Sequence, residues 1–312
     1  MNILKFILLG ILAFSFQAFA FETVKVADDV YALVGDLGQR SEANLGHNMT
    51  SGFIITNEGV VVIDAGGSIA DAKAIHQAIK KVTSKPVKWV INTGGQDHRW
   101  IGNSYFNKLG VTIIASEACM SDMIERKDFQ FSMAKKYIKD KFEDTAPVFP
   151  NKTFKTSYQL PIKDKQITLL YTGGGHTKGD IFVILKKQGI VFTGDIIFSQ
   201  RLLGVQPNGG LHWIKTLAYL RDNIKPHIVI PGHGAVTNLK TALHDTYDYL
   251  LMLKNGVIEG FNNDAFDAFE AIQELDQSEF SYLKNYSNLS FRSKNALHMA
   301  QEIEALSQLK NN

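Results

Sequence analysis

Three short glycine-rich segments of the chain contain residue types that bind metal ions. They read Gly-Gly-Gly-His176-Thr-Lys-Gly-Asp, Thr-Gly-Asp195 and Pro-Gly-His233-Gly. Each lies beside an apolar run that predicts a β-strand, and glycine allows the sharp turns that bring side chains from separate strand ends together. Imidazole and carboxylate groups suit zinc, and also iron or manganese. The pattern therefore predicts a metal centre that includes His176, Asp195 and His233.

A fourth segment, residues 92–103, adds further candidates. It reads Asn-Thr-Gly-Gly-Gln-Asp-His-Arg-Trp-Ile-Gly-Asn and follows the apolar run 87–91. His98 and Asp97 are residue types that can bind a metal, and Arg99 adds a positive charge beside them. A serine-centred triad is not indicated, because no Gly-x-Ser-x-Gly segment occurs in the sequence.

The elements expected to position these residues alternate between strands and helices. Repeated strand–helix alternation in two halves predicts an α+β fold, a four-layer αββα sandwich over residues 21–240. A helical C-terminal extension is expected over residues 241–312. Apolar runs predict strands over residues 30–34, 52–56, 60–63, 87–91, 113–115, 167–171, 190–192 and 228–230, and helical spacing predicts helices over residues 68–82, 116–142, 212–224, 243–253, 266–275 and 296–309.

The first residues predict export. Lys5 precedes an apolar run, and Ala-Phe-Ala20 has the small-x-small pattern of a cleavage site, so residues 1–20 are expected to be a signal peptide. Cys119 is the sole cysteine, which excludes an internal disulfide. A formal net charge of +2 gives no indication of nucleic acid as a partner. We expect a periplasmic or secreted protein, with no membrane span after cleavage of the leader.

The order and flanking residues of these motifs resemble the metallo-β-lactamase superfamily. His176, Asp195 and His233 match three of its ligand motifs, and Asp64, in Val-Ile-Asp-Ala-Gly-Gly, matches a supporting acidic position. Stretches such as Lys-Pro-Val-Lys-Trp-Val-Ile-Asn-Thr93 look most like the exported branch associated with sulfur oxidation and quinoprotein systems. The resemblance implies the sandwich fold and a hydrolase that uses metal-bound hydroxide.

The first metal motif departs from this family's pattern of N-T-H-x-H-x-D-H. In a gap-free alignment the leading histidines become Gly94 and Gln96, and the final histidine becomes Arg99. A shift by one residue places Asp97 and His98 at the Asp-His pair, but both leading histidines are still lost. The resemblance then implies that His98 or Asp97 completes a site with Asp195 and His233, and we take His98 as the fourth predicted ligand beside His176. Asp97 is a candidate catalytic residue that would orient a metal-bound hydroxide, and Arg99 is a candidate that would stabilise the oxyanion. We therefore expect one divalent metal, with zinc as the first choice and iron or manganese as alternatives, and we expect Gly94→His to raise metal occupancy.

Several alternatives stay open at this stage. Arg99 could clamp an anionic substrate group, or it could pair with Asp195 or Asp97. His47 could be a replacement ligand or a loop histidine, and His212 could line the pocket. The leading hypothesis is a periplasmic metal-dependent hydrolase of ester, thioester or amide bonds in a small-molecule substrate. The alternatives are a catalytically degenerate accessory protein that binds a metal or an anion, and a mononuclear iron oxygenase acting on sulfur compounds.

Overall fold

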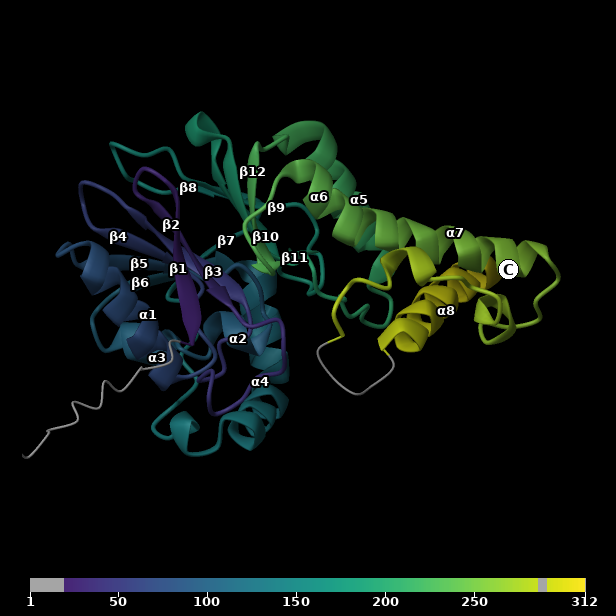
Figure 1. Cartoon of the computed structure of the whole chain (residues 1–312), viewed down its shortest axis with the longest axis horizontal. Coiled ribbons are helices and arrows are strands. Elements are labelled where there is room, and N and C mark those ends of the chain that lie inside the picture. The colour runs from purple at the N-terminus through teal and green to yellow at the C-terminus, as the bar shows by residue number, and fades with distance from the viewer. Residues whose placement is uncertain (1–19, 286–290, 312) are drawn as a thin grey trace, which may run out of the picture.

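Two β-sheets packed face to face form the centre of the protein (Figure 1). The computed structural model describes residues 20–285 and 291–311, so all of the expected signal peptide except Ala20 lies outside the described residues. Buried apolar side chains from both sheets form the core between them. In spatial order the first sheet contains β1 (Phe21–Ala27), β2 (Val30–Gly35), β3 (Thr50–Ile55), β4 (Val60–Ile63), β5 (Val87–Ile91), β6 (Thr112–Ser116) and β7 (Lys152–Phe154).

The second sheet carries two of the metal-binding motifs. β11 and β12 are parallel neighbours, whereas β8, β9 and β10 continue the sheet in antiparallel pairs. In the first sheet, β4 to β7 are parallel, which brings the ends of successive strands to one edge. The order across the second sheet is β12 (Ile228–His233), β11 (Ile190–Phe198), β10 (Ile181–Leu185), β9 (Thr168–Tyr171) and β8 (Ser157–Gln159).

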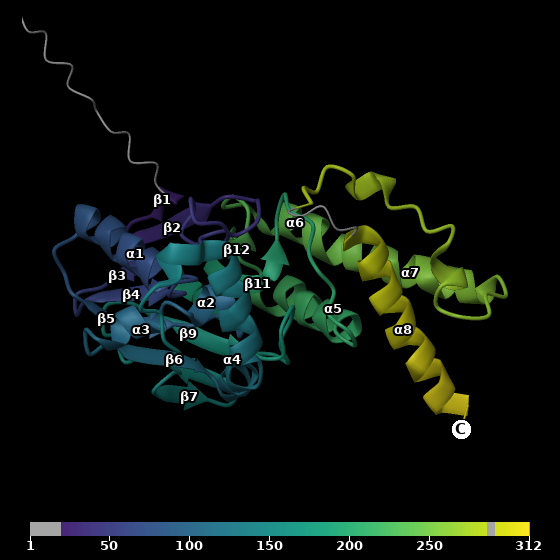
Figure 2. The ribbon, with the colours of Figure 1, turned by 90° about the horizontal axis from the view of Figure 1, so that it is seen from below.

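Helices cover the outer faces of both sheets, which completes the four layers expected from the sequence (Figures 1 and 2). Ser68 caps the first helix, because its side chain accepts a hydrogen bond from Asp71 N. The helices are α1 (Ile69–Val82), α2 (Asp97–Trp100), α3 (Asn103–Asn107), α4 (Glu117–Ile138), α5 (Gly210–Tyr219), α6 (Leu239–Leu243), α7 (Tyr249–Asn262) and α8 (Phe291–Asn311), with short turns η1 (Lys139–Phe142), η2 (Lys186–Gln188), η3 (Leu220–Ile224), η4 (His244–Asp248), η5 (Glu270–Ile272) and η6 (Ser278–Phe280).

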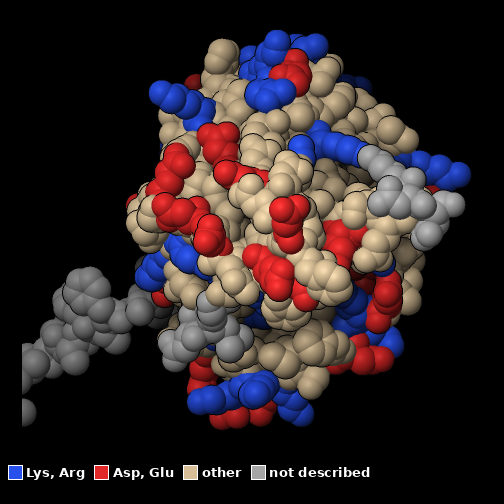
Figure 3. All heavy atoms as spheres, turned by 90° about the vertical axis from the view of Figure 1, so that its right-hand side faces the viewer, with Lys and Arg blue, Asp and Glu red and all other residues tan. Residues whose placement is uncertain are grey.

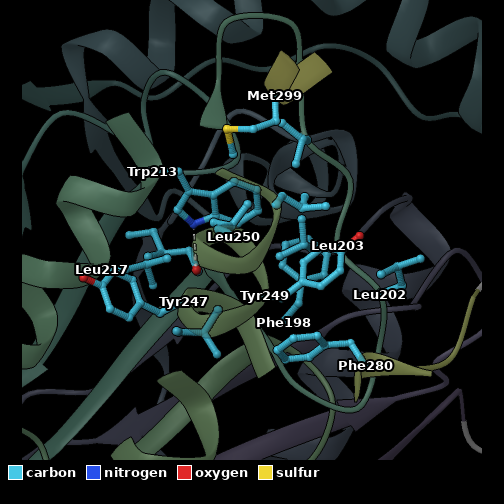
Figure 4. Packing of buried hydrophobic residues seen from close by; sticks show 14 of the residues in the cluster. Phe198, Leu202, Leu203, Trp213, Leu217, Tyr247, Tyr249, Leu250, Phe280 and Met299 are labelled. Carbon is cyan, nitrogen blue, oxygen red and sulfur yellow. Dashed lines mark hydrogen bonds between the residues drawn. The ribbon is translucent and has the colours of Figure 1, made fainter. Parts of the chain in front are cut away.

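The helical extension packs on the outer face of the second sheet, against the part of β11 that follows Asp195. Figure 4 shows Trp213 of α5 and Tyr249 of α7 in one apolar cluster with Met299 of α8. Burial of such large side chains stabilises the extension against the sandwich. The hydroxyl of Thr246, within the extension, donates a hydrogen bond to Phe198 O of β11 (2.7 Å). The extension is therefore fixed to the same strand that carries Asp195.

The helix predicted over residues 266–275 is wrong, because only the short turn η5 forms there. Asp267 Oδ1 accepts hydrogen bonds from Phe269 N (2.9 Å) and Glu270 N (3.0 Å), and this local turn competes with a helix. Phe266 is 90% exposed, so the apolar periodicity does not mark a buried face. Acidic side chains gather on this end of the molecule (Figure 3). Among the described residues, no helix is long and apolar enough to cross a bilayer.

Candidate metal centre

Three predicted ligands meet at one edge of the sandwich. His98 lies on α2, just after β5, Asp195 lies within β11, and His233 ends β12. One ligand atom from each lies within 4.8 Å of the others. His98 Nε2 lies 3.3 Å from Asp195 Oδ2, and His233 Nε2 lies 3.1 Å from Asp195 Oδ1. The sequence prediction that these three residues converge is consistent with this geometry.

A close backbone approach brings the Asp195 strand up to the first motif. Gly194 has a φ of +49°, and a Cβ atom there would lie 2.2 Å from Thr93 Oγ1. Glycine is thus required both for the conformation and for the space. Thr93 in turn donates hydrogen bonds from its backbone N (2.7 Å) and its hydroxyl to the Asp64 carboxylate. Asp64 therefore fixes Thr93 next to Gly194, which agrees with the supporting role that the resemblance implied.

The donor atoms of the cluster fit a cation. His98 Nε2 and Asp195 Oδ2 are both buried and have no hydrogen-bond partner. Burial lowers the pKa of His98 to about 4, against the attraction of Asp195, so its imidazole is neutral at physiological pH. Burial opposes ionisation of Asp195, but Arg99 and His98 outweigh it and hold its pKa well below the ordinary range. A neutral imidazole and an ionised carboxylate buried this close together are ligand types that suit a divalent metal.

Neighbouring groups orient the two histidines. Asp97 Oδ1 lies 3.2 Å from His98 Nδ1 and favours the tautomer with a free lone pair on Nε2. The Asp97 carboxylate also pairs with Arg40. Asn48 O lies 2.7 Å from His233 Nδ1, which favours the same tautomer there. Arg201 Nη1, however, lies 2.6 Å from that Nδ1 and can donate to it only in the other tautomer, which directs Nε2–H at Asp195.

Arg99 lies beneath the cluster and has no exposed surface. Its Nη2 donates to Asp195 Oδ1 (2.5 Å) and to Gly232 O (2.7 Å). Its Nη1 donates to Asp64 Oδ2 (2.9 Å) and to Thr50 O (3.0 Å). Burial opposes the charge of Arg99, but Asp195 and Asp64 outweigh it and raise the pKa of the guanidinium. This favours the alternative in which Arg99 pairs with Asp195, and a direct catalytic role of Arg99 stays a prediction.

Other protein groups occupy the space beside Gly94 and Gln96, the two positions at which the resemblance would place histidines. A Cβ atom on Gly94 would lie 2.1 Å from the Asp180 carboxylate. Gln96 Oε1 accepts a hydrogen bond from Arg126 (3.2 Å), which also donates to Gly95 O. An introduced histidine at position 94 would have to displace Asp180. The sequence-based expectation that Gly94→His raises metal occupancy overlooked this obstruction.

His176 lies in the same pocket but outside the three-residue cluster. Its Nδ1 lies 2.9 Å from Gly204 O, so Nδ1–H donates to that carbonyl and Nε2 is left as an acceptor. Burial lowers the pKa of His176 to about 4. Its ring packs against Phe198 and Trp213. The predicted role of His176 as a metal ligand stays a prediction, and its position suits contact with a substrate or water.

Two other histidines lie away from the cluster. His47 is completely buried, and its Nδ1 lies 2.8 Å from Asp71 Oδ1, so its contacts are those of a structural residue. His212 Nε2 lies 3.0 Å from Gly175 O. It lines a second hollow of about 380 Å³ that also includes His176. These contacts favour a structural role for His47. They place His212 in a hollow beside His176, outside the three-residue cluster.

The pocket above the cluster contains residues that sequence reasoning missed. It has a volume of about 100 Å³, and its walls include Arg40, Arg201, Phe291 and Lys294. Arg40 lies between β2 and β3 and Arg201 follows β11, and neither was predicted to line a pocket. Phe291 and Lys294 begin α8, almost 60 residues beyond His233 in the chain. Only the three-dimensional packing of the extension could have placed them here.

Comparison with known proteins identifies the family. The model of the metallo-β-lactamase superfamily matches residues 46–233, which include all three residues of the cluster. The chain belongs to this superfamily. It is 23% identical to the metallo-β-lactamase IND-1 of Chryseobacterium indologenes over 191 residues, which are 60% of this chain and 72% of IND-1.

Solved structures show the same fold. A metallo-β-lactamase from Pontibacter korlensis superposes with a TM-score of 0.59 at 21% identity, covering 74% of this chain and 99% of that protein. A double variant of the sec-alkyl sulfatase PisA1 superposes with a TM-score of 0.70 at 15% identity, covering 91% of this chain and 50% of that protein. The likeness to the sulfatase thus reaches further along this chain than the likeness to the lactamase.

Proposed function

We propose that this superfamily member is a periplasmic hydrolase that uses a single divalent metal held by His98, Asp195 and His233. The observation that carries the proposal is the pair of unpartnered buried atoms, His98 Nε2 and Asp195 Oδ2, which lie 3.3 Å apart. Leaving both atoms buried and unpaired costs free energy that a bound cation would recover. The bound metal would supply a Lewis acid that lowers the pKa of a water molecule.

The protein groups around the centre would position that water and the scissile bond. Asp97 fixes the ring of His98, while Arg99 keeps Asp195 ionised. His176 Nε2 remains to accept a hydrogen bond from water or from the leaving group. The chain thus has a carboxylate, neutral imidazoles and a hollow for a small molecule. These groups suit hydrolysis of an ester, thioester or amide without a protein nucleophile.

The proposal of one metal rests on the two sides of the cluster. On one side the guanidinium of Arg99 bonds to Asp195 Oδ1, so that oxygen already has a positive partner. On the other side Gly94 offers no ligand and Asp180 fills the adjacent space. A second cation next to the buried guanidinium would also be repelled by it.

The proposed location and branch rest on the sequence. Lys5, the following apolar run and Ala20 form a leader typical of export, and the flanking motifs resemble the exported sulfur-oxidation and quinoprotein-associated proteins. Because the likeness to the sec-alkyl sulfatase includes most of the chain, sulfate esters belong in the first substrate screen. Carboxylate esters, thioesters and amides complete the screen.

The decisive experiment is the metal content of the mature protein, purified from the periplasm without chelators or a histidine tag. We expect about one zinc, iron or manganese per chain, measured by plasma mass spectrometry. His233→Ala should lose the metal, whereas His227→Ala, at an exposed histidine outside the cluster, should keep it. A metal-free wild-type protein, or a His233→Ala variant that keeps its metal, contradicts the proposal.

One observation favours a second candidate, an accessory protein that binds a ligand without turnover. The contact of 2.6 Å between Arg201 Nη1 and His233 Nδ1 is compatible with a tautomer in which His233 donates to Asp195 instead of binding a metal. Turnover of any ester, thioester, amide or sulfate ester by the metal-loaded wild type, absent from Asp195→Ala, excludes this candidate. Metal binding without turnover supports it.

A further inference from the structure

Helix α2 carries three residues of the candidate site within a single turn. It spans Asp97–Trp100, so Asp97, His98 and Arg99 are three of its four residues. A helix of one turn has little stability of its own, because few hydrogen bonds offset the entropic cost of its nucleation. The orientation of these three side chains must therefore be fixed by contacts from elsewhere in the fold.

Helix α4 lies beside α2 and faces it with polar side chains (Figures 1 and 2). Asp122, Arg126 and Gln130 are spaced four residues apart, so they project from one side of α4. This side is turned toward the protein interior, since Asp122 and Gln130 are buried. Buried polar side chains that are hydrogen-bonded hold neighbouring segments in one geometry. The partners of these side chains show which segment they hold.

Gln130 bonds to the chain at both ends of α2. Its Nε2 donates to Gly95 O (2.8 Å) just before the helix, and its Oε1 accepts a hydrogen bond from Trp100 Nε1 (2.8 Å) at the last helical residue. Gln130 is 2% exposed and Trp100 is completely buried. Both hydrogen bonds are thus shielded from water, and the loss of either would leave a buried polar group unpaired. One side chain therefore spans the helix that carries His98.

The peptide of Gly95 is held from two directions. Arg126 Nη2 donates to the same Gly95 O (3.2 Å), and its Nη1 donates to Gln96 Oε1 (3.2 Å). The N–H of Gly95 donates to Thr177 Oγ1 (3.3 Å). A Cβ atom at position 95 would lie 2.1 Å from Asp122 Oδ2, so the absence of a side chain lets α4 approach this closely. The turn is therefore fixed before the chain enters α2.

The position of α2 determines the geometry of the metal cluster. Of the three residues in the cluster, His98 lies on α2, whereas Asp195 and His233 lie on β11 and β12, which pair with each other in one sheet. A shift of α2 would move His98 Nε2 away from Asp195 Oδ2, which lies 3.3 Å from it. Groups that fix the orientation of metal ligands commonly change metal affinity, although they do not touch the metal.

We propose that Gln130 is a positioning residue for the metal centre, which holds His98 Nε2 toward Asp195 by bonding to both ends of α2. Arg126 assists it at the first of these ends. The inference rests on the proposed function for the metal, whereas the fixing of α2 by Gln130 is a property of the metal-free protein. A purely structural role of Gln130 would lower the stability of the fold and leave the metal affinity of the folded protein unchanged.

The zinc affinity of the folded Gln130→Met variant tests the proposal. Methionine resembles glutamine in length and volume but makes neither hydrogen bond. Competition with a chromophoric zinc chelator should show binding about tenfold weaker than in wild type, since two hydrogen bonds that orient one ligand are lost. The visible spectrum of the cobalt(II)-loaded protein should also change, because it reports the ligand geometry. Wild-type zinc affinity or a wild-type cobalt spectrum overturns the proposal.

Thr56→Val is the matched control for the loss of a buried hydrogen bond. The buried hydroxyl of Thr56 donates to Gly59 O (2.7 Å) in the hairpin between β3 and β4. The metal centre lies at the other ends of these strands, where Arg99 contacts Thr50 O and Asp64. Thr56→Val should lower the urea midpoint of unfolding and keep wild-type zinc affinity. Equal losses of zinc affinity in Thr56→Val and Gln130→Met would show that reduced stability alone is the cause, which overturns the proposal.

A second variant keeps the proposal testable if Gln130→Met does not fold. Arg126 is partly exposed, and Arg126→Gln removes one of the two side-chain donors to Gly95 O. Zinc should then bind about threefold more weakly, a smaller loss because Gln130 still holds that carbonyl. In that case, unchanged zinc affinity in Arg126→Gln overturns the proposal.

Hydrogen exchange of the metal-free protein separates this inference from the proposed function. Mass spectrometry of peptides that contain residues 95–101 should show about tenfold faster exchange in Gln130→Met than in wild type, with no change in Thr56→Val. A wild type that binds no metal but shows this difference contradicts the hydrolase and supports the positioning role. A wild type that binds one metal, with equal exchange in wild type and Gln130→Met, supports the hydrolase and overturns the positioning role.

Discussion

Arg99 Nη2 donates a hydrogen bond of 2.5 Å to Asp195 Oδ1, while the other oxygen of Asp195 faces His98 without a partner. The two oxygens of this buried carboxylate thus have different surroundings. The negative charge at Oδ1 is balanced by Arg99, which keeps its positive charge at any physiological pH. The other oxygen remains available to a cation. This division of Asp195 supports the proposal of a centre with one metal.

Asp195→Ala is expected to abolish metal binding. The substitution removes the only carboxylate of the cluster and leaves two neutral imidazoles, which bind a divalent metal weakly. Metal content after dialysis against about one equivalent of zinc is the measurement. Asp222→Ala, at an exposed aspartate, serves as the control. Full metal content in Asp195→Ala would show that the ligands lie elsewhere.

Arg99→Met is expected to destabilise the metal-free protein by about 3–5 kcal/mol. The substitution leaves the carboxylates of Asp64 and Asp195 buried without their shared positive partner. Urea unfolding followed by circular dichroism gives the free energy of unfolding. Excess zinc should restore part of the loss, since the metal supplies charge to Asp195. A change below about 1 kcal/mol would mean that solvent or rearrangement compensates both carboxylates.

Gly94→His is expected to leave the metal content at one per chain. The Asp180 carboxylate lies where the new Cβ would be placed, so the substitution should cost about 1–3 kcal/mol in stability from overpacking. The double variant Gly94→His with Asp180→Gly removes that obstruction and is the informative comparison. A second metal in the single variant would show that Asp180 moves aside easily, as the sequence-based expectation required.

Asp180 is expected to make stability fall as the pH rises. Burial and the charge of Asp195 raise its pKa from 3.8 to about 8. The folded state therefore keeps a proton that the unfolded chain loses above about pH 4. As a result, the contribution of Asp180 to the free energy of unfolding declines between pH 4 and 8 by at most about 1.4 kcal/mol per pH unit.

Asp180→Asn removes this titration. Its free energy of unfolding, relative to wild type, should rise between pH 5 and pH 8, whatever the constant offset caused by the amide. Urea titrations at several pH values measure the difference, and Asp128→Asn on the exposed face of α4 is the control. Parallel curves for wild type and Asp180→Asn would mean that Asp180 is ionised in the folded protein.

The sequence was sufficient to predict the sandwich and the convergence of His98, Asp195 and His233. Each of these residues is adjacent to, or part of, a buried apolar strand, and parallel strands bring their ends to a common edge. Local patterns could predict this because the periodicity and the turns are encoded within a few residues. The helical extension was predicted for the same reason.

Features that depend on long-range packing were not predictable. Lys294 reaches the pocket only because Asn295 fixes α8 to residues 203–205, and no local motif encodes that contact. The sequence left the orientation of Arg99 open, since a charged residue after His98 could face solvent or the interior. Its burial follows from the carboxylates that surround it. Helical spacing in residues 266–275 was misleading because Asp267 forms a competing turn.

Arg201→Gln is expected to tighten zinc binding about tenfold, which corresponds to about 1.4 kcal/mol. The substitution removes a positive charge in contact with His233 and removes the donor that competes for Nδ1, so Asn48 O alone would set the tautomer. Competition with a fluorescent zinc chelator measures the metal affinity, and Arg221→Gln at an exposed arginine is the control. Weaker zinc binding in Arg201→Gln would show that Arg201 supports the metal-binding orientation of His233 instead of opposing it.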